Sequence, residues 1–406
     1  MHSLGIWGWG MQSDCKVAII GAGPNGLSLA AHLKEQGTEF RIFGRAMETW
    51  DTRMPKGMLL KSDGFASSLY APDDKFSYAD YCGEHGIPYA PLGLPPSLET
   101  FSAYGHAFQQ DLVPELEEKM VVSLRQEEAG GYVLALDDGT TCHTRSVVVA
   151  AGITHFARMP DALAGAPRHL VSHSAGHHDL SRFKGRKIAV IGAGSSATDI
   201  AGLLHREGAE AHLVCRDTLW FSGRMPDHRS LRSRLRSPNS PIGPGWRSFL
   251  CARFPHLYHH LPSQQRIAIA RGHLGPAPAY FARDMVMGRA YMHLGLQPQA
   301  ATPKGDGVEL VLVNKHGETR TLEVDHVIAA TGYKPALARL PFLDESLHRQ
   351  IDAIDDVPEL GAAFEASTAG LYFIGALAVH SFGPFVRFAC GAAFTAPRLS
   401  RHLARH

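Results

Sequence analysis

The sequence predicts an α/β fold with two parallel-sheet domains, because one strand–turn–helix–strand pattern occurs twice in its 406 residues. In each copy an apolar strand runs into a glycine-rich turn, and a helix rich in small residues leads to a second strand. The first copy covers residues 16–43 and the second covers residues 187–215. A chain of this length exceeds what one hydrophobic core supports, so two or three domains are the natural expectation.

The turn of the first copy, residues 21–26, has the spacing G-x-G-x-x-G. Between a strand and a helix, this spacing allows a tight turn and a close approach of backbone N–H groups to a pyrophosphate. The positive end of the helix dipole adds to the attraction. We therefore expect a Rossmann-like domain that binds a dinucleotide through Gly21, Gly23, Pro24 and Gly26.

The turn of the second copy, residues 192–197, repeats this pattern with alanine in the third glycine position. One such turn is weak evidence, whereas two turns separated by about one domain length are much stronger. The alternative is a pair of strand–turn–helix corners without ligands. The residues predicted to bind the second dinucleotide are Gly192, Gly194, Ser195, Ser196 and Ala197.

The residue at the end of the second strand of each copy indicates which dinucleotide is bound. An acid there binds a ribose hydroxyl, whereas an arginine accommodates the 2′-phosphate of NADP. Arg216 ends the second copy and favours NADPH, although an arginine at a strand end is also an ordinary surface residue. The first copy ends in Gly44 and Arg45, so the ribose contact would come from Glu48 or a backbone group. FAD is assigned to this loop, with Arg45, from its place in the two-loop arrangement.

The two patterns divide the chain into an FAD-binding domain and an NADPH-binding domain inserted into it. We expect the FAD-binding domain at residues 1–165 and 326–406, and the NADPH-binding domain at residues 166–325. Within the latter, residues 219–294 form an irregular insert. The insert carries many arginines: Arg224, Arg229, Arg232, Arg234, Arg236, Arg247 and Arg253. These arginines bind an anionic substrate, contact a partner or form a solvated face.

The composition excludes several classes of partner. The formal charge of +1 provides no global field to attract nucleic acid or an anionic membrane. No run approaches the roughly 20 apolar residues of a membrane span. The six cysteines are scattered, without a C-x-x-C pair or metal-ligand spacing, so we expect no metal and a reduced, cytoplasmic protein. The sequence leaves open whether the protein is a monomer or a homo-oligomer.

With the two loops, Arg216 and the segment Ala330-Thr-Gly-Tyr333, the chain resembles the class B flavin-dependent monooxygenases. These include the flavin-containing monooxygenases and the related Baeyer–Villiger and N-hydroxylating enzymes. The resemblance extends from Lys16 to the C-terminal helix and is loose in the insert. It includes Gly332 and the segment 149–152, which looks like the strand that rejoins the FAD domain.

The resemblance also carries over individual positions near the flavin. Trp50 resembles the tryptophan that follows the first strand–helix–strand unit, and Asp63 stands where the family has an asparagine beside the flavin. Asp63 would manage the proton of the oxygen intermediate, or it is a turn residue before Gly64. His173 resembles the histidine of the family fingerprint. Gly375 lies on a C-terminal loop that would contact the flavin ring, or form a core-packing turn.

The resemblance implies an NADPH-dependent flavoprotein monooxygenase that oxygenates a small organic molecule with O2. NADPH would pass a hydride to the flavin, and the reduced flavin would capture O2 as a C4a-(hydro)peroxyflavin. A flavin reductase or oxidase that passes electrons to a quinone, ferredoxin or O2 is the first alternative. Reduction through a dithiol is excluded, because no adjacent cysteines are present. A non-catalytic, flavin-binding redox sensor is the second alternative.

Overall fold

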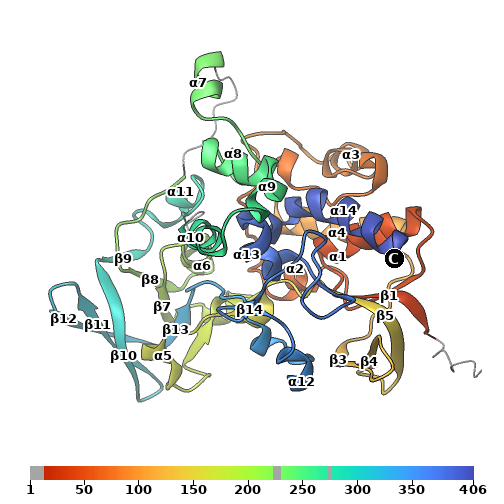
Figure 1. Ribbon diagram of the computed structural model, residues 1–406. Helices are drawn as coiled ribbons and strands as arrows, with labels where there is room; N and C mark the ends of the chain where they lie inside the picture. Colours follow the sequence, from red (N-terminus) through yellow and green to blue (C-terminus); the bar gives the residue numbers. More distant parts are fainter. Residues whose placement is uncertain (1–12, 223–229, 273–276) are drawn as a thin grey trace, which may run out of the picture.

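The computed structural model describes residues 13–222, 230–272 and 277–406 and confirms the α/β fold with two Rossmann-like sheets. Figure 1 shows the sheets side by side, with helices around and between them. The first sheet has the order β2-β1-β5-β4-β3, with β16 also paired to β5. Its strands are β1 (Cys15–Ile20), β2 (Phe40–Phe43), β3 (Val121–Gln126), β4 (Tyr132–Leu136), β5 (Thr141–Val149) and β16 (Leu371–Phe373).

The first sheet is parallel where the glycine loop leaves it and antiparallel at its far edge. Strand β1 lies between β2 and β5 and is parallel to both, and β16 is parallel to the end of β5. The hairpin strands β4 and β3 continue the sheet in antiparallel register. Helix α1 (Pro24–Glu35) packs against the C-terminal helix α14 (Ala392–Arg405), so the two ends of the described chain share this domain.

The second sheet is entirely parallel, with the order β6-β13-β7-β8-β9. Alternate residues of β7 serve its two faces, as a strand buried on both sides requires. Ile188 and Val190 pack under helix α6 (Ser195–Arg206), whereas Ala189 and Ile191 pack against an antiparallel sheet. The parallel sheet consists of β6 (Val171–His173), β7 (Lys187–Ile191), β8 (Glu210–Cys215), β9 (Tyr291–Leu294) and β13 (His326–Ala329). The antiparallel sheet consists of β10 (Leu296–Lys304), β11 (Gly307–Asn314) and β12 (Thr319–Val324).

The domain limits stay a prediction, but one strand lies on the other side of the expected boundary. The sequence predicts residues 326–329 in the returning FAD domain, whereas the structure pairs them as β13 with β7 and β6 of the second sheet. An apolar strand buried on both faces has the same sequence pattern in either sheet. Only the strands with which it pairs show to which sheet such a strand belongs. The chain contributes to the first sheet again at β16.

The insert is a series of short helices rather than an irregular segment. It contains α7 (Leu231–Arg236), α8 (Trp246–Arg253), α9 (Pro255–His259), α10 (Ser263–Gly272) and α11 (Ala282–Val286). These helices are too short to produce a clear periodic pattern. Pro255 occupies the first turn of α9, where its missing N–H costs nothing.

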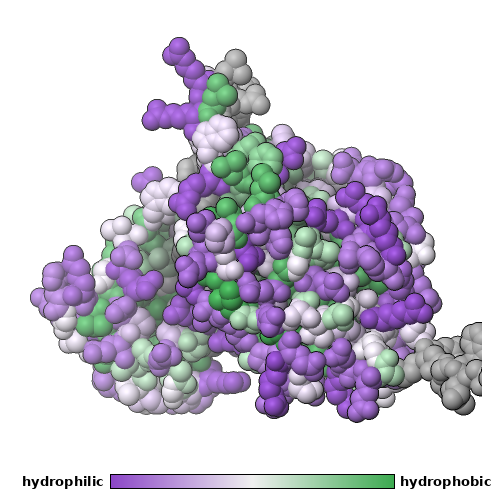
Figure 2. Space-filling model, in the orientation of Figure 1, coloured by the Kyte–Doolittle hydropathy of each residue, from purple (hydrophilic) through white to green (hydrophobic). Residues whose placement is uncertain are grey.

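Some arginines of the insert lie outside the described residues, and others are exposed on its first helix. Arg224 and Arg229 lie outside the described residues, and so does the side chain of Arg234. Arg232 and Arg236 are exposed on α7, which stands away from the body in Figure 1. Figure 2 shows apolar side chains at the surface below α7, where Trp246, Leu250 and Leu257 of α8 and α9 are exposed.

None of the helices in the described part of the chain combines the length and the apolar character that a membrane crossing requires. Within the same residues, no three histidine, cysteine, aspartate or glutamate side chains gather as metal ligands.

A partly buried chain of hydrogen bonds links β6 to β13. Arg182 donates to Nδ1 of His177 (2.7 Å), so the proton of His177 is on Nε2, which donates to Ser172 Oγ (2.6 Å). Ser172 then donates to Nε2 of His326 (2.6 Å), and Nδ1 of His326 donates to the carbonyl of His169 (3.0 Å).

His177 and His326, the two histidines of this hydrogen-bond chain, are neutral in the folded protein. Burial lowers the pKa of His177 to about 3, with a contribution from the nearby charge of Arg182. Burial also lowers the pKa of His326 to about 4. In the unfolded chain a histidine has a pKa near 6.5, so the unfolded state takes up protons at a higher pH than the folded state.

We therefore expect the contribution of these two histidines to the free energy of unfolding to be constant above about pH 7 and to fall as the pH drops from 6.5 toward 4. Each of the two histidines contributes roughly 2 kcal/mol of this loss at pH 5. Urea titrations at pH 7.5 and 5.0 measure it. His177→Gln should reduce the difference between the two pH values, whereas His205→Gln, at an exposed position, should not. Equal pH dependence of His177→Gln and the unaltered protein would contradict the proposed neutral state.

Candidate functional site between the two sheets

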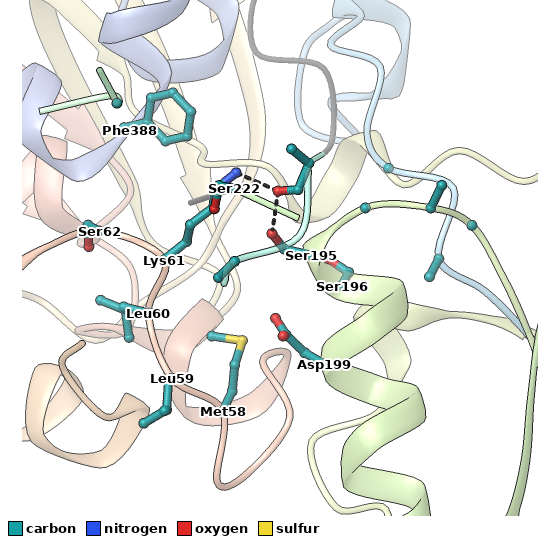
Figure 3. Close-up of a pocket in the computed structure, with 18 of the residues that line it drawn as sticks. Met58, Leu59, Leu60, Lys61, Ser62, Ser195, Ser196, Asp199, Ser222 and Phe388 are labelled. Atoms are coloured by element: carbon teal, nitrogen blue, oxygen red, sulfur yellow. Dashed lines mark hydrogen bonds between the residues drawn. The ribbon is translucent and has the colours of Figure 1, made fainter. Parts of the chain in front are cut away.

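A cavity of about 910 Å³ lies between the two sheets. The second glycine loop forms one wall (Figure 3), and the segment that follows the first strand–helix–strand unit forms the opposite wall. Residues just after β13 and residues before α14 complete it. The side chains and backbone that line the cavity include Trp50, Met58, Leu60, Lys61, Asp63, Phe101, Arg158, Gly192, Gly194, Ser195, Ser196, Asp199, Arg216, Gly332 and Arg387.

The second glycine loop brings a free helix N-terminus to this cavity. Gly192 has φ +150°, and a Cβ there would lie 2.4 Å from the carbonyl oxygen of Ala330. Ala197 is fully buried in the first turn of α6 beside Gly192. Helix α6 begins at Ser195 with neither a side-chain cap nor an acidic residue in its first turn. Its amide groups and dipole are therefore available to an anion.

The first glycine loop has the same construction. Gly21 has φ +111°, and a Cβ there would lie 2.4 Å from the carbonyl oxygen of Ala150. A Cβ at Gly26 would lie 1.9 Å from the carbonyl oxygen of Gly21, whereas a Cβ at Gly23 would meet no atom within 4 Å. Helix α1 starts at Pro24 without a side-chain cap. The loop thus has an open side at Gly23, as a bound phosphate would require.

Gly375 lies beside this first loop. It follows β16 with φ +71°, and a Cβ there would contact the side chain of Asn25 at 3.6 Å. The side-chain oxygen Oδ1 of Asn25 is buried and has no hydrogen-bond partner in the described structure. A buried polar atom without a partner suits a site that a polar ligand completes. The residues present therefore fit a bound dinucleotide at the first loop.

Each strand end that would hold a ribose is followed by an exposed arginine. Arg216 follows β8, is exposed and lines the cavity. Arg45 follows β2, is exposed and pairs with Glu48 at 3.5 Å. An acid does lie beside the end of β2, because Glu117 pairs with Phe43 as an isolated bridge. Its carboxylate is occupied by Arg41, at 2.6 and 2.8 Å.

The model of one protein family matches residues 15–229, which is more than half of the chain: the pyridine nucleotide-disulphide oxidoreductases. The chain belongs to this family. Its members are flavin-dependent NAD(P)H oxidoreductases, so the predicted enzyme class and the recognised two-loop architecture are confirmed.

The curated relatives of this oxidoreductase include a monooxygenase and a reductase. Indole-3-pyruvate monooxygenase YUCCA1 of Oryza sativa subsp. japonica is 28% identical over 213 residues, covering 50% of this chain and 48% of the relative. Ferredoxin–NADP reductase 2 of Latilactobacillus sakei subsp. sakei (strain 23K) is 26% identical over 203 residues, covering 49% and 54%. The chain thus spans about half the length of these curated relatives.

Among solved structures, the ornithine N-hydroxylase KtzI of Kutzneria sp. 744, determined with FAD and NADP+, has the same fold. Its TM-score is 0.76 at 18% identity, covering 96% of this chain and 99% of that one. At this identity the likeness concerns the fold, which extends over both sheets and the insert.

The structure places Trp50 and Asp63, two residues assigned from the resemblance, on the cavity wall. Trp50 lies on α2 (Glu48–Thr52), packs edge-on against Phe101 with centroids 4.6 Å apart, and lines the wall. Asp63 also lines it, and its Oδ1 accepts from the N–H of Gly93 at 3.0 Å. Asp63 precedes the short helix Gly64–Ala66, so its position serves a turn as well as the cavity.

His173 connects the fingerprint segment to the loop of Gly332. Its Nδ1 accepts from the N–H of Ala175, so Nε2 carries the proton and donates to the carbonyl of Gly332 at 3.1 Å. The ring also meets Tyr333 edge-on. This contact fixes the loop after β13, which forms part of the cavity wall.

The sequence did not single out several charged residues that line the cavity, among them Lys61, Arg158, Asp199 and Arg387. Burial raises the pKa of Asp199 to about 7. Desolvation lowers the pKa of Lys61, and the charge of Asp199 opposes this shift. Asp199 follows Ser195 by four residues and so lies on the same face of α6, a spacing that could have identified it.

Two alanine substitutions separate the packing role of the first loop from its binding role. Gly26→Ala should lower the melting temperature of the flavin-free protein or prevent folding, because its Cβ would collide with the Gly21 carbonyl. Gly23→Ala should leave that temperature unchanged and weaken FAD binding roughly ten-fold, since its Cβ would occupy the side open to a phosphate. Thermal melts and FAD titrations measure both. Unaltered FAD affinity in Gly23→Ala would contradict the assignment.

Proposed function

We propose that the protein is an NADPH-dependent flavoprotein monooxygenase that oxygenates a small organic molecule. The observation that supports this most strongly is the single cavity lined by the second glycine loop on one side and by Trp50 and Asp63, which follow the first loop, on the other. Two bound dinucleotides held by these loops would meet there with a substrate and O2.

The residues that would hold each cofactor follow from the loops. FAD would bind at Gly21, Gly23, Pro24 and Gly26, with Trp50, Arg45 and Gly375 near it. NADPH would bind at residues 192–197, with the guanidinium of Arg216 on the 2′-phosphate. FAD, when bound, supplies a two-electron carrier that accepts hydride from NADPH and reacts with oxygen.

The chain's own residues would control water and protons in the cavity. Apolar side chains such as Met58, Leu60 and Phe101 line its walls and would exclude water from the reacting atoms. Asp63 has Oδ1 engaged with Gly93, so Oδ2 is the oxygen that would hold or release a proton.

Electron transfer to a disulfide fits the cavity poorly. All six cysteines are free and buried. Cys215 and Cys390 line the cavity, where burial raises the pKa of both thiols, that of Cys390 to about 12, and this suppresses the reactive thiolate. The similarity to ferredoxin–NADP reductase 2 supports one second candidate, a reductase that passes electrons to ferredoxin or another external acceptor.

Stopped-flow mixing of the NADPH-reduced protein with O2 separates these functions. A monooxygenase should show a transient near-ultraviolet absorbance that differs from both the oxidised and the reduced flavin. Reoxidation with stoichiometric H2O2 and no transient would contradict the monooxygenase and favour a reductase or oxidase. Failure of NADPH to bleach the flavin would contradict both enzymes and favour a redox sensor.

The choice of NADPH over NADH depends on Arg216. Arg216→Gln should raise the Kd for NADPH about ten-fold or more and leave the Kd for NADH within two-fold, because a charge-assisted phosphate contact is lost. Arg320→Gln on the exposed strand β12 is the matched control and should change neither. Equal affinity of Arg216→Gln and the unaltered protein for NADPH would remove the 2′-phosphate assignment.

A further inference from the structure

A buried carboxylate on α6 has an oxygen without a partner. Asp199 lies in the second turn of α6, lines the cavity and is only 6% exposed. Its Oδ1 has no hydrogen-bond partner within the described part of the chain. Figure 3 shows the carboxylate pointing away from α6 toward Met58 and the segment that carries Lys61. A buried acceptor left in this state is costly unless a ligand satisfies it.

Two donors on the cavity wall, Lys61 and Ser195, bond to a backbone carbonyl rather than to Asp199. The ammonium group of Lys61 donates to the carbonyl of Ala277, and the hydroxyl of Ser195 donates to the same oxygen at 3.3 Å. Figure 3 shows these two bonds beside Asp199. Lys61 therefore acts on Asp199 only through its charge. The side chains that face the carboxylate across the gap, Met58 and Leu60, carry no donor.

We propose that Asp199 accepts a hydrogen bond from an N–H group of the molecule that fills the cavity. The amide of a nicotinamide ring and the nitrogen of a substrate both present this chemistry. The first source depends on the proposed NADPH site, whereas the second requires only the cavity. In either case Asp199 positions the ligand. The N–H of the ligand loses its hydrogen bond to water when it enters the cavity, and the carboxylate of Asp199 provides a hydrogen bond in its place.

The strength of this contact depends on pH. Burial raises the pKa of Asp199 to about 7, and the positive charge of Lys61 opposes the rise. An ionised carboxylate is the stronger acceptor, so N–H binding strengthens as the pH rises through 7. Other ionisable groups on the cavity wall and on α11, which packs on α6, are Asp63, Arg158, Cys215, Arg216, Asp217, Tyr280, Arg283, Asp284, Arg387 and Cys390.

The first experiment measures NADP+ binding to the FAD-loaded protein by calorimetry at pH 6.5 and 8.5. From pH 6.5 to pH 8.5, the NADP+ affinity of the unaltered protein should rise up to about four-fold more than that of Asp199→Asn, because the Asn side chain cannot ionise. Asp199→Asn reports the contribution of the dinucleotide's own phosphates. Asp284→Asn, on the exposed side of α11, is the matched control and should behave as the unaltered protein.

The acetylpyridine analogue of NADP+, which has a methyl ketone in place of the amide, identifies the donor without any variant. If the nicotinamide amide is the donor, the extra gain in affinity disappears with this analogue. If a substrate nitrogen is the donor, NADP+ shows no extra gain, and benzamide binds the NADP+-saturated protein more tightly at pH 8.5 than at 6.5, whereas acetophenone does not.

Absence of the extra pH dependence with both NADP+ and benzamide would overturn the assignment of Asp199. That result differs from a failure of the proposed function, in which NADP+ would not bind the FAD-loaded protein at either pH.

Discussion

Both sheets depend on the same steric constraint at the start of their helices. The first glycine of each loop lies against a carbonyl at the end of a neighbouring parallel strand, Ala150 after β5 for Gly21 and Ala330 after β13 for Gly192. A Cβ at either glycine would lie 2.4 Å from that oxygen. Only glycine allows the chain to turn so tightly that α1 and α6 begin directly over the strand ends.

This constraint explains why the cavity lies where it does. The N-terminus of α6, which has no side-chain cap, opens into the space between the sheets, and the segment after β2 closes that space from the other side. The walls are mainly apolar, so a charge placed there is strongly perturbed. Asp199 and Lys61 are such charges, and each shifts toward its neutral form. The same low polarity that would protect a reactive flavin also makes a single carboxylate sensitive to pH near neutrality.

Buried histidines connect the cavity wall to the sheet that supports it. His173 holds the loop of Gly332, and the next turn of chain places His177 in the hydrogen-bond chain that reaches β13 through Ser172. Each ring has one defined tautomer, because its other nitrogen has a fixed partner. The loop after β13, which lines the cavity, is thus held by polar contacts as well as by strand pairing.

The sequence by itself determined the two glycine loops, the strands and helices beside them, and therefore the fold class. These signals are local, because the spacing of glycines and the apolar runs act within about 30 residues. Tertiary structure decided which sheet β13 joins, which acid lies beside β2, and what occupies the cavity walls. Glu117 reaches β2 from more than 70 positions away and is neutralised there by Arg41. Lys61 and Asp199 come from different domains, so their shared environment exists only after the two sheets pack, and no local pattern encodes it.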